Sequence, residues 1–344
     1  MRATNGTGRL GERPGQGGIG CESRVSITPQ PLNVNDNDLW AAIDQAWAEL
    51  GIIIKNPVCD GRLQRCAVEG GRPGNLDGAY RICTDAPANI YFQNFKTGQK
   101  GTFFFGSSSK TWSPAERREF SARVEEGRRQ KEAEQRKAWD LAARKAERIY
   151  DEAAPCGGHP YLTAKGVLPH SKLRASGPDL IVPLLNRFGL VRSLQFIKPD
   201  GTKRFLAGGQ KSGCFLNLDA GAADRSQTLL VCEGAATGLS LFESTGFEVL
   251  VSFDAGNLKT VALGARQDYP GREIVVCADN DAAGPVNIGA VKARATALAV
   301  GGRLSIPFLT EGQPCDFNDL HQAQGPETVQ AFIEAAFSVG GPYA

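Results

Sequence analysis

Acidic residues in the C-terminal third of the chain have types and spacing that could bind a metal ion. Glu233 follows one apolar, β-branched run, and Asp279 and Asp281 follow another. A third group, Asp316 and Asp319, comes about 35 residues later. The carboxyl ends of parallel strands converge in space, so carboxylates placed there can share a divalent cation. Such a site is suited to phosphoryl or nucleotidyl transfer.

Asp279 and Asp281 lie two positions apart, so both carboxylates can turn toward one cation from a loop that leaves a strand. Hard oxygen ligands without a histidine favour Mg²⁺ or Mn²⁺ over zinc. Mg²⁺ bound by a few carboxylates also keeps positions for water and phosphate oxygens. Taken alone, the pair fits a solvated turn equally well. Glu233 upstream, with Asp316 and Asp319 downstream, favours the metal site.

An EF-hand calcium loop is a competing interpretation of the sequence D-N-D-A-A-G at 279–284. A loop that begins at Asp279 would have its glycine at Gly284, as that motif requires. However, Ala290 stands where the bidentate glutamate belongs, and Ala283 replaces a side-chain ligand. We therefore do not expect an EF-hand. Gly284 is expected to open a helix, whose N-terminus could face phosphate.

The acidic residues belong to a segment in which strands and helices alternate. The pattern predicts strands near 229–232, 249–252, 274–277 and 304–308, and helices near 236–244, 258–268, 285–300 and 326–337. Near-continuous apolar strands are typical of a parallel sheet covered on both faces. Ligands bind such open sheets at the carboxyl ends of the strands. The residues expected at those ends are Glu233, Asp254, Asp279 and Asp281.

A basic cluster precedes the acidic residues. The runs 180–184 and 190–197 predict a β-hairpin with Gly189 in its turn, and 203–206 predicts the start of another strand. Alternation could place several cations on one face, as a groove for a triphosphate or a nucleic-acid backbone. A solvated strand face is the competing interpretation, and it stays open. The cluster consists of Arg192, Lys198, Lys203, Arg204 and Lys211.

The rest of the chain divides into segments of different composition. Residues 1–34 are rich in Gly, Pro and Ser and predict a disordered tail, whereas apolar spacing from Asp36 predicts a helix to about residue 51. Ser113 and Glu116 form a capping-box pattern that predicts a long charged helix connecting two domains. The predicted boundaries are a tail at 1–34, a small N-terminal α+β domain at 35–112, a helical connector at 113–152, a basic subdomain at 153–227 and the acidic α/β domain at 228–340.

Residues 52–112 combine turn signals with short β-prone runs, which predicts a small β-rich domain. Aromatic residues crowd this stretch. They form either a small hydrophobic core or a stacking platform for bases, aided by Arg81, Lys96 and Lys100. Both interpretations stay open.

The composition of the 344-residue chain, 41% hydrophobic and 22% charged, is typical of a soluble protein with two domains. A net charge of +2 excludes a uniformly basic chain, so a polyanion site must come from local clustering. No membrane-length apolar run or secretory signal is visible, so we expect a cytoplasmic protein that does not bind membranes. Nine cysteines in such a chain are expected to be thiols. Cys59, Cys66 and Cys83 lack a CxxC pair and a nearby histidine, so zinc is not expected.

Two of the acidic segments resemble the TOPRIM domain of DnaG-type primases, topoisomerases, OLD-type nucleases and recombination proteins. They are L-L-V-C-E-G at 229–234 and V-V-C-A-D-N-D-A-A-G at 275–284. Flanking motifs narrow the resemblance to TraC-type plasmid conjugation primases and related phage or mobile-element primases. These motifs are H-P-Y-L-T-x-K-G at 159–166, S-L-Q-F-I at 193–197, D-G-x-K-R-F-L at 200–206, S-F-D-A-G-N-L at 252–258 and D-F-N-D-L at 316–320.

The resemblance implies an α/β fold with a TOPRIM catalytic core, Rossmann-like with a largely parallel sheet. An α+β basic subdomain would precede this core, with a small N-terminal β-rich domain and a long charged connecting helix. The implied activity is synthesis of short RNA primers on single-stranded DNA from NTPs with Mg²⁺ or Mn²⁺. Glu233, Asp279 and Asp281 would be the catalytic, metal-binding residues, extended by Asp316 or Asp319. The residues expected to bind nucleotide or nucleic acid are Lys165, Arg192, Lys198, Lys203, Arg204, Lys211, Asp254 and Asn257.

Two departures from the family pattern qualify the implied function. No zinc-binding module like that of DnaG is recognisable, so template recognition is expected to differ and to involve residues 52–112. No helicase motif is recognisable, so a replicative helicase or a single-strand-binding protein is a candidate partner. A TOPRIM nuclease and a non-catalytic accessory protein that binds single-stranded DNA stay open as alternatives.

Overall fold

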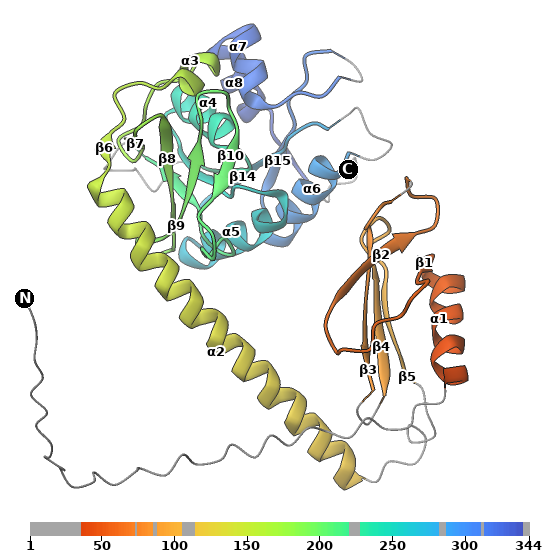
Figure 1. Cartoon of the computed structure of the whole chain (residues 1–344). Helices are drawn as coiled ribbons and strands as arrows, with labels where there is room; N and C mark the ends of the chain where they lie inside the picture. The colour runs from red at the N-terminus through yellow and green to blue at the C-terminus, as the bar shows by residue number, and fades with distance from the viewer. Residues whose placement is uncertain are drawn as a thin grey trace, which may run out of the picture. The chain divides into compact units, whose positions relative to one another are not determined.

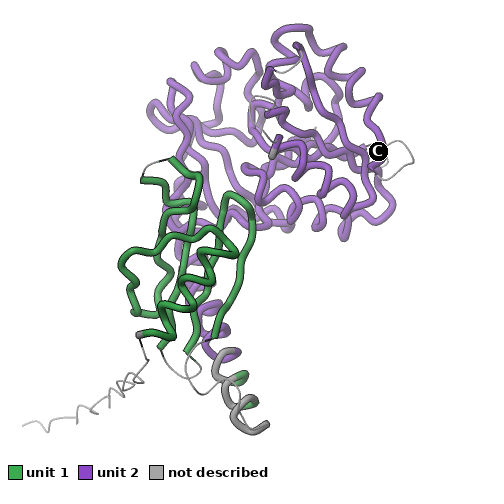
Figure 2. The backbone as a smooth tube through the Cα atoms, turned by 90° about the vertical axis from the view of Figure 1, so that its right-hand side faces the viewer, with its two compact units in different colours: residues 1–124 green, residues 125–344 purple. Residues whose placement is uncertain are grey.

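The computed structural model describes residues 36–72, 74–84, 88–104, 114–219, 228–281, 287–310 and 313–339. Within it the chain forms two compact units, residues 1–124 and 125–344 (Figure 2). The predicted tail, the Ser113 cap and Gly284 lie outside the described residues. The five predicted domain boundaries stay predictions.

The first unit contains a five-stranded antiparallel sheet whose strands follow one another in sequence order. Strand alternation points one set of side chains, among them Ile82, Ile90 and Phe92, toward a buried core. Helix α1 covers this face with Leu39 and Ile43 (Figure 1). The elements are α1 (Asp36–Leu50), β1 (Ile52–Ile53), β2 (Gln64–Val68), β3 (Gly78–Cys83), β4 (Asn89–Asn94) and β5 (Lys100–Phe104).

The cysteines of this unit are spread over both sides of its sheet. Cys66 is buried and pairs with Gly78, which places it on the face covered by α1. Cys83 lies five residues along the same strand from Gly78, so its side chain points to the opposite face. Cys59 is exposed in the loop before β2. Cys66 and Cys83 therefore lie on opposite faces of this sheet.

The second unit begins within α2 (Pro114–Glu152). Arg128 pairs with Glu125 and Glu132 across turns of this charged helix, as the alternating charges predict. Near its C-terminal end, Ala146, Ile149 and Tyr150 pack against the first sheet of this unit. That sheet is antiparallel with order β10-β9-β8-β7-β6. Its strands are β6 (Ala154–Pro155), β7 (Arg174–Ser176), β8 (Asp179–Leu185), β9 (Val191–Ile197) and β10 (Lys203–Phe205).

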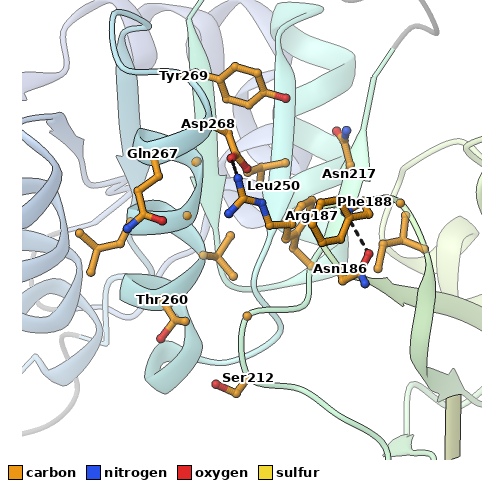
Figure 3. Close-up of a pocket in the computed structure, with 18 of the residues that line it drawn as sticks. Asn186, Arg187, Phe188, Ser212, Asn217, Leu250, Thr260, Gln267, Asp268 and Tyr269 are labelled. Atoms are coloured by element: carbon orange, nitrogen blue, oxygen red, sulfur yellow. Dashed lines mark hydrogen bonds and ion pairs between the residues drawn. The ribbon is translucent and has the colours of Figure 1, made fainter. Parts of the chain in front are cut away.

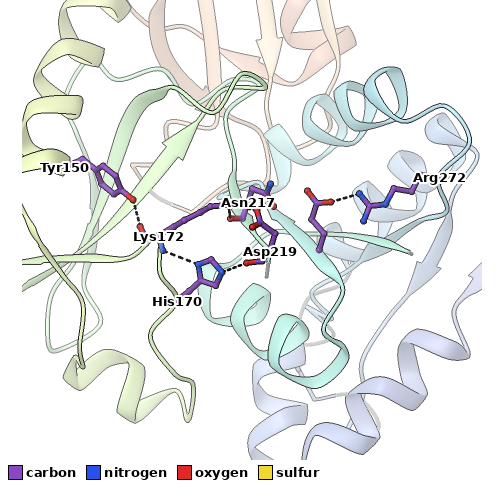
Figure 4. A network of polar contacts seen from close by, with 7 residues as sticks. Tyr150, His170, Lys172, Asn217, Asp219 and Arg272 are labelled. Atoms are coloured by element: carbon purple, nitrogen blue, oxygen red, sulfur yellow. Dashed lines mark hydrogen bonds and ion pairs between the residues drawn. The ribbon is translucent and has the colours of Figure 1, made fainter. Parts of the chain in front are cut away.

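The hairpin of β8 and β9 forms as predicted, and Gly189 adopts φ +77° in its turn. A polar network anchors the loop before β7 to the second sheet (Figure 4). Lys172 donates to the Asn217 carbonyl at 2.9 Å and pairs with Asp219, while the Tyr150 hydroxyl donates to the Lys172 carbonyl at 2.8 Å. These bonds fix the position of the antiparallel sheet beside the parallel one.

The second sheet has the order β11-β13-β12-β14-β15-β16. Its four central strands are parallel, and β11 and β16 are antiparallel edges. Alternating apolar side chains of the central strands supply two cores, one with α4, α7 and α8 and the other with α5 and α6 (Figure 1). The strands are β11 (Leu216–Leu218), β12 (Leu229–Cys232), β13 (Glu248–Val251), β14 (Ile274–Cys277), β15 (Arg303–Ser305) and β16 (Phe337–Ser338).

The helices of this layer differ from the predictions mainly near the C-terminus. A helix predicted at 326–337 ends at Glu334. The Arg303 guanidinium binds the carbonyls of Glu334 and Ala336, and Phe337, the first residue of β16, then pairs with Leu304 of β15. A separate, unpredicted helix precedes it. The helices are α3 (Pro160–Ala164), α4 (Ala235–Thr245), α5 (Ala255–Asp268), α6 (Ile288–Val300), α7 (Phe317–Gln324) and α8 (Pro326–Glu334). No helix among the described residues is both long and apolar enough to cross a membrane.

Candidate active site

Three neighbouring parallel strands end in carboxylates at one edge of the second sheet. Strands β13, β12 and β14 lie side by side and are completely buried. Glu233 follows β12, Asp254 follows β13 and Asp279 follows β14. The predicted strand ends therefore meet as expected for a ligand site of an open α/β sheet.

The loop that carries Asp279 and Asp281 is tied to the segment that carries Asp316. Asn280 and Cys315 exchange two backbone hydrogen bonds of 3.0 Å, and the Asn280 side chain donates to the Pro307 carbonyl at 3.0 Å. This bridge brings Asp316 next to Asp279, although the two residues are far apart in sequence.

The start of α6 packs directly against the same loop. Asn287 is the N-cap, and its side-chain oxygen accepts from the N–H groups of Ala290 at 3.0 Å and Asp281 at 3.2 Å. A Cβ on Gly289 would lie 2.6 Å from the Asp279 carbonyl oxygen and 3.0 Å from an Asp281 carboxylate oxygen. Only glycine permits this approach, so α6 sets the position of both aspartates.

A cavity of about 180 Å³ joins acidic and basic side chains at this edge. Glu233, Asp279 and Asp316 line it together with Lys165 and Lys203. The first turn of α4 also lines it, and the N-cap of α4, a glycine, provides no side-chain hydrogen bond to that turn. Lysines and open backbone N–H groups opposite carboxylates suit a phosphorylated ligand that binds with a cation.

Asp279 is the most strongly perturbed carboxyl group of the site. Burial raises its pKa to about 7, assisted by repulsion from Asp316, Glu233 and Asp281, while Lys203 acts in the opposite direction. Its Oδ1 atom is buried without a hydrogen-bond partner. An ionised oxygen in such a place is costly unless a cation compensates it.

Glu233 is held in a similar electrostatic environment. Burial raises its pKa, and repulsion from Asp254 and Asp281 adds to the effect. A hydrogen bond from the Ala255 backbone N–H and attraction to Lys292 act in the opposite direction. Carboxylates that raise one another's pKa form a pool of negative charge, which favours binding of a divalent cation.

The donor set can be compared with what a metal needs. Among the described residues, no three His, Cys, Asp or Glu side chains are arranged to ligate one ion directly. Mg²⁺ does not require such a cage, because it binds through one or two carboxylates and completes its octahedron with water and phosphate oxygens. The buried, unpartnered oxygen of Asp279 and the all-oxygen donor set therefore fit Mg²⁺ or Mn²⁺.

Asp316 and Asp319 take different places in the structure. Asp316 is the N-cap of α7 and accepts from the Asp319 N–H at 2.8 Å, while the Asp319 carboxylate accepts from the Asp316 N–H at 3.1 Å. Only Asp316 lines the cavity. Both carboxylates take part in this capping box, so the position of Asp316 at the cavity is what makes it the better placed of the two for a cation.

The basic cluster is divided by strand alternation. Lys203 faces the cavity, with its ammonium 5.5 Å from the centre of the Tyr161 ring. Its neighbour Arg204 points the other way and pairs with Asp179 at 3.0 Å. Arg192 pairs with Asp140 of α2 at 2.8 Å, and Lys198 is exposed after β9. Of the predicted basic residues, Lys165 and Lys203 line the cavity.

The remaining predicted residues support the site from one side. Lys211 pairs with Asp254 at 3.0 Å, and Asp254 caps α5 by accepting from the Asn257 N–H at 2.9 Å. The buried Asn257 side chain donates to the Cys214 and Ser252 carbonyls and accepts from the Gly213 N–H. Asn257 thus ties the loop that carries Lys211 to the end of β13.

Two aromatic residues of the cavity were not singled out from the sequence. Phe253 is the only described non-glycine residue with positive φ, at +69°, and its N–H donates to the Glu233 carbonyl at 2.8 Å. Its ring meets Phe205 edge to face. Tyr161 is buried, and its hydroxyl has no partner. Both lie within motifs that resemble primases, but no pattern of spacing distinguishes them there.

A larger cavity of about 690 Å³ lies away from these carboxylates, between the β8–β9 turn and α5 (Figure 3). Arg187, Phe188 and Tyr269 line it, and Arg187 pairs there with Asp268. No carboxylate of the acidic site lines this cavity. Size alone would favour it, but the perturbed carboxylates and lysines identify the smaller cavity as the candidate active site.

Known proteins are similar in sequence to this chain. Residues 228–327 match the family model described as the Toprim domain. The chain is 32% identical over 291 residues to a DNA primase TraC of Escherichia coli, which covers 81% of this chain and 20% of that protein. It is 29% identical over 307 residues to a second DNA primase TraC of Escherichia coli, with coverages of 83% and 28%. The predicted resemblance to TraC-type TOPRIM primases is thus confirmed.

The chain spans less than a third of the length of these two relatives. The crystal structure of the Aquifex aeolicus primase, which comprises zinc-binding and RNA polymerase domains, is also similar. The TM-score is 0.41 at 12% identity, and the match covers 86% of this chain and 83% of that chain.

Proposed function

We propose that this chain is a DNA primase that synthesises short RNA primers on single-stranded DNA by metal-dependent nucleotidyl transfer. The observation that carries the proposal is the Asp279 carboxylate, whose Oδ1 atom is buried without a partner, within an acidic group that lines one cavity with Lys165 and Lys203. Similarity to two DNA primases over about four-fifths of the chain supports the same function.

In this proposal Glu233, Asp279 and Asp281 bind Mg²⁺ or Mn²⁺, and Asp316 extends the acidic group. A divalent ion bound there would polarise the triphosphate and favour the alkoxide form of the primer 3′-hydroxyl. Binding would also offset the mutual repulsion that raises the pKa of Asp279. Asp319 does not line the cavity and caps α7, so it is assigned to the fold and not to the metal.

The chain's own residues would orient the nucleotide. Lys165 and Lys203 carry the positive charge that phosphate oxygens need, and the open N–H groups of the α4 first turn supply hydrogen bonds beside them. Glu233 lies in the same cavity, where its carboxylate would hold the cation beside the nucleotide phosphates. Lys211, Asp254 and Asn257 hold the adjoining loop.

The proposal is tested by primer synthesis with labelled NTPs on single-stranded DNA, with Mn²⁺ or Mg²⁺ added. Glu233→Gln and Asp279→Asn are expected to lower the rate by about 100-fold or more, the scale of losing one preorganised electrostatic group. Glu134→Gln, at an exposed position of α2, is the matched control and should leave the rate unchanged. Wild-type rates in the two active-site variants would disprove the assignment.

The same reactions distinguish the alternative functions. Cleavage of DNA by the wild type without NTPs would indicate a TOPRIM nuclease. DNA binding that is unaffected by chelation, without synthesis or cleavage, would indicate an accessory protein. A role in plasmid or other mobile-element replication stays a prediction. A helicase or single-strand-binding partner is also a prediction, which a pull-down with candidate partners would test.

A further inference from the structure

One face of the N-terminal sheet is covered by α1, and the opposite face combines cations with aromatic rings. Backbone register defines this second face, which we call the open face. One row across the sheet is Arg65, Ala79, Gln93 and Lys100, because these residues pair in turn from β2 to β5. The next rows are Arg81, Tyr91 and Thr102, then Cys83, Asn89 and Phe104.

Charge on the open face has a single sign. Strands β2 to β5 contain Arg65, Arg81 and Lys100 and not one Asp or Glu. Within the described part of the chain, none of these three cations forms an ion pair with a carboxylate. No carboxylate in this part of the chain therefore neutralises these charges, which favours a polyanion that lies across the strands.

Aromatic rings accompany these cations on the open face. Phe104 is 55% exposed and Phe95, beyond the end of β4, is 44% exposed. The Arg65 guanidinium lies 4.3 Å from the centre of the Phe95 ring, and that of Arg81 lies 5.9 Å from the Tyr91 ring. Flat rings and guanidinium planes held on a rigid sheet are surfaces on which bases stack.

We propose that the open face binds single-stranded nucleic acid by stacking bases on Tyr91, Phe95 and Phe104 and pairing phosphates with Arg65, Arg81 and Lys100. Charge complementarity selects a polyanion, and the interleaved rings select one that carries bases. This inference deepens the proposed function, since it assigns template binding to a surface separate from the acidic site. It requires neither a metal nor a nucleotide.

Equilibrium binding of the full chain to a labelled oligothymidylate of about 16 nucleotides tests the proposal. Fluorescence anisotropy would be recorded in EDTA, so that the acidic site does not contribute through a metal. A strand of equal length that lacks bases is the second probe. Variants Tyr91→Ala and Phe104→Ala remove rings, and Arg65→Ala combined with Lys100→Ala removes cations.

We expect each aromatic variant to weaken binding of the intact strand by about 5- to 150-fold. The same variants should leave binding of the base-free strand nearly unchanged, because that strand cannot stack. The double cation variant should weaken both probes and lower the slope of log K against log salt by about 1.4. Trp47→Ala, an exposed ring on α1, and Lys55→Ala, an exposed cation outside the strands, are the matched controls and should change neither.

Equal binding of both strands, or full binding by the Phe104→Ala variant, would overturn the inference, as would an equal loss in the two controls. Phe104 is largely exposed, so its loss leaves the core intact even where Tyr91→Ala perturbs the sheet. Asp279→Asn should bind the intact strand like the wild type. Primer synthesis can thus fail while binding persists, and the two proposals fail separately.

Discussion

Asn280 and Cys315 exchange two backbone hydrogen bonds of 3.0 Å, although a helix and a strand separate them in the sequence. This bridge places Asp279 beside Asp316. Burial raises the pKa of Asp279, and repulsion from the Asp316 carboxylate raises it further. The fold thus brings together charges that repel one another, and buried packing maintains the arrangement. A cation bound between these carboxylates would offset their repulsion and thereby stabilise the native state.

The contact of Gly289 with the acidic loop leads to a prediction for Gly289→Ala. An alanine Cβ would lie 2.6 Å from the Asp279 carbonyl oxygen, so α6 or the loop must shift. We expect a loss of about 1–3 kcal/mol in the free energy of unfolding, together with reduced primer synthesis. Urea denaturation and the synthesis assay would measure both quantities.

Gly264→Ala in the middle of α5 is the matched control, because a Cβ there meets nothing within 4 Å. It should raise the free energy of unfolding by about 0.5–1 kcal/mol, since alanine favours the helix over glycine. If the two alanine variants behave alike, the packing of α6 against Asp279 does not constrain the site.

The raised pKa of Asp279 predicts how stability depends on pH. Its ordinary value is 3.8, and in the folded chain it is about 7. Between about pH 4 and 7 the Asp279 carboxyl group is therefore protonated in the native state and ionised in the unfolded state. For this reason it lowers the free energy of unfolding as pH rises over that range. Asp279→Asn lacks the penalty and should be more stable than the wild type at pH 8, by at most about 4 kcal/mol.

Denaturation in EDTA at several pH values would measure this difference, which should disappear toward pH 4. Added Mg²⁺ at pH 8 should stabilise the wild type more than Asp279→Asn, because ligand that binds only the native state raises its stability. A stability difference that is independent of pH would contradict the assigned environment of Asp279.

Much of this site could be predicted from the sequence, because burial and strand ends leave clear patterns. The apolar runs before Glu233 and Asp279 were sufficient to place both residues at one edge of a parallel sheet. The division of the basic cluster was also implicit, since adjacent residues such as Lys203 and Arg204 must point to opposite faces of a strand. The packing of the two sheets decides whether Lys203 or Arg204 points toward the carboxylates, and this packing cannot be inferred from local sequence.

Other features of the site and the sheet leave a weaker signal in the sequence, or none. The three-residue spacing of Asp316 and Asp319 is a capping pattern, which indicates the start of α7 and a structural role for Asp319. The positive φ of Phe253 has no such signal, because a bulky residue adopts it only where the surrounding structure enforces it. The short edge strands β11 and β16 form through pairing with neighbours, which leaves little trace in three residues or fewer.

The capping box separates the roles of Asp316 and Asp319. Asp316→Asn keeps an N-cap, because asparagine accepts the same hydrogen bond, but it removes a charge from the cavity. We expect slightly higher stability at neutral pH, because less repulsion acts on Asp279, and a higher Mg²⁺ or Mn²⁺ requirement for synthesis. Asp319→Ala should cost about 1 kcal/mol of stability and leave the metal requirement unchanged. Metal titrations of activity and thermal unfolding of both variants would measure these effects. If Asp319→Ala raises the metal requirement and Asp316→Asn does not, the assignment is wrong.

The neighbouring cations Lys203 and Arg204 test whether position or charge alone attracts the nucleotide, because they lie on opposite faces of β10. Lys203 lines the cavity and lowers the pKa of Asp279, whereas Arg204 is 61% exposed and pairs with Asp179. Lys203→Ala should raise the KM for NTP by about 10-fold or more, since a charge-assisted hydrogen bond contributes about 1.5–3 kcal/mol. Arg204→Ala removes the same charge from the opposite face of β10 and should change KM less than about 2-fold, as exposed ion pairs contribute little. Steady-state kinetics over a range of NTP concentrations would compare them, and equal increases in KM would show that general positive charge, and not the position of Lys203, attracts the nucleotide.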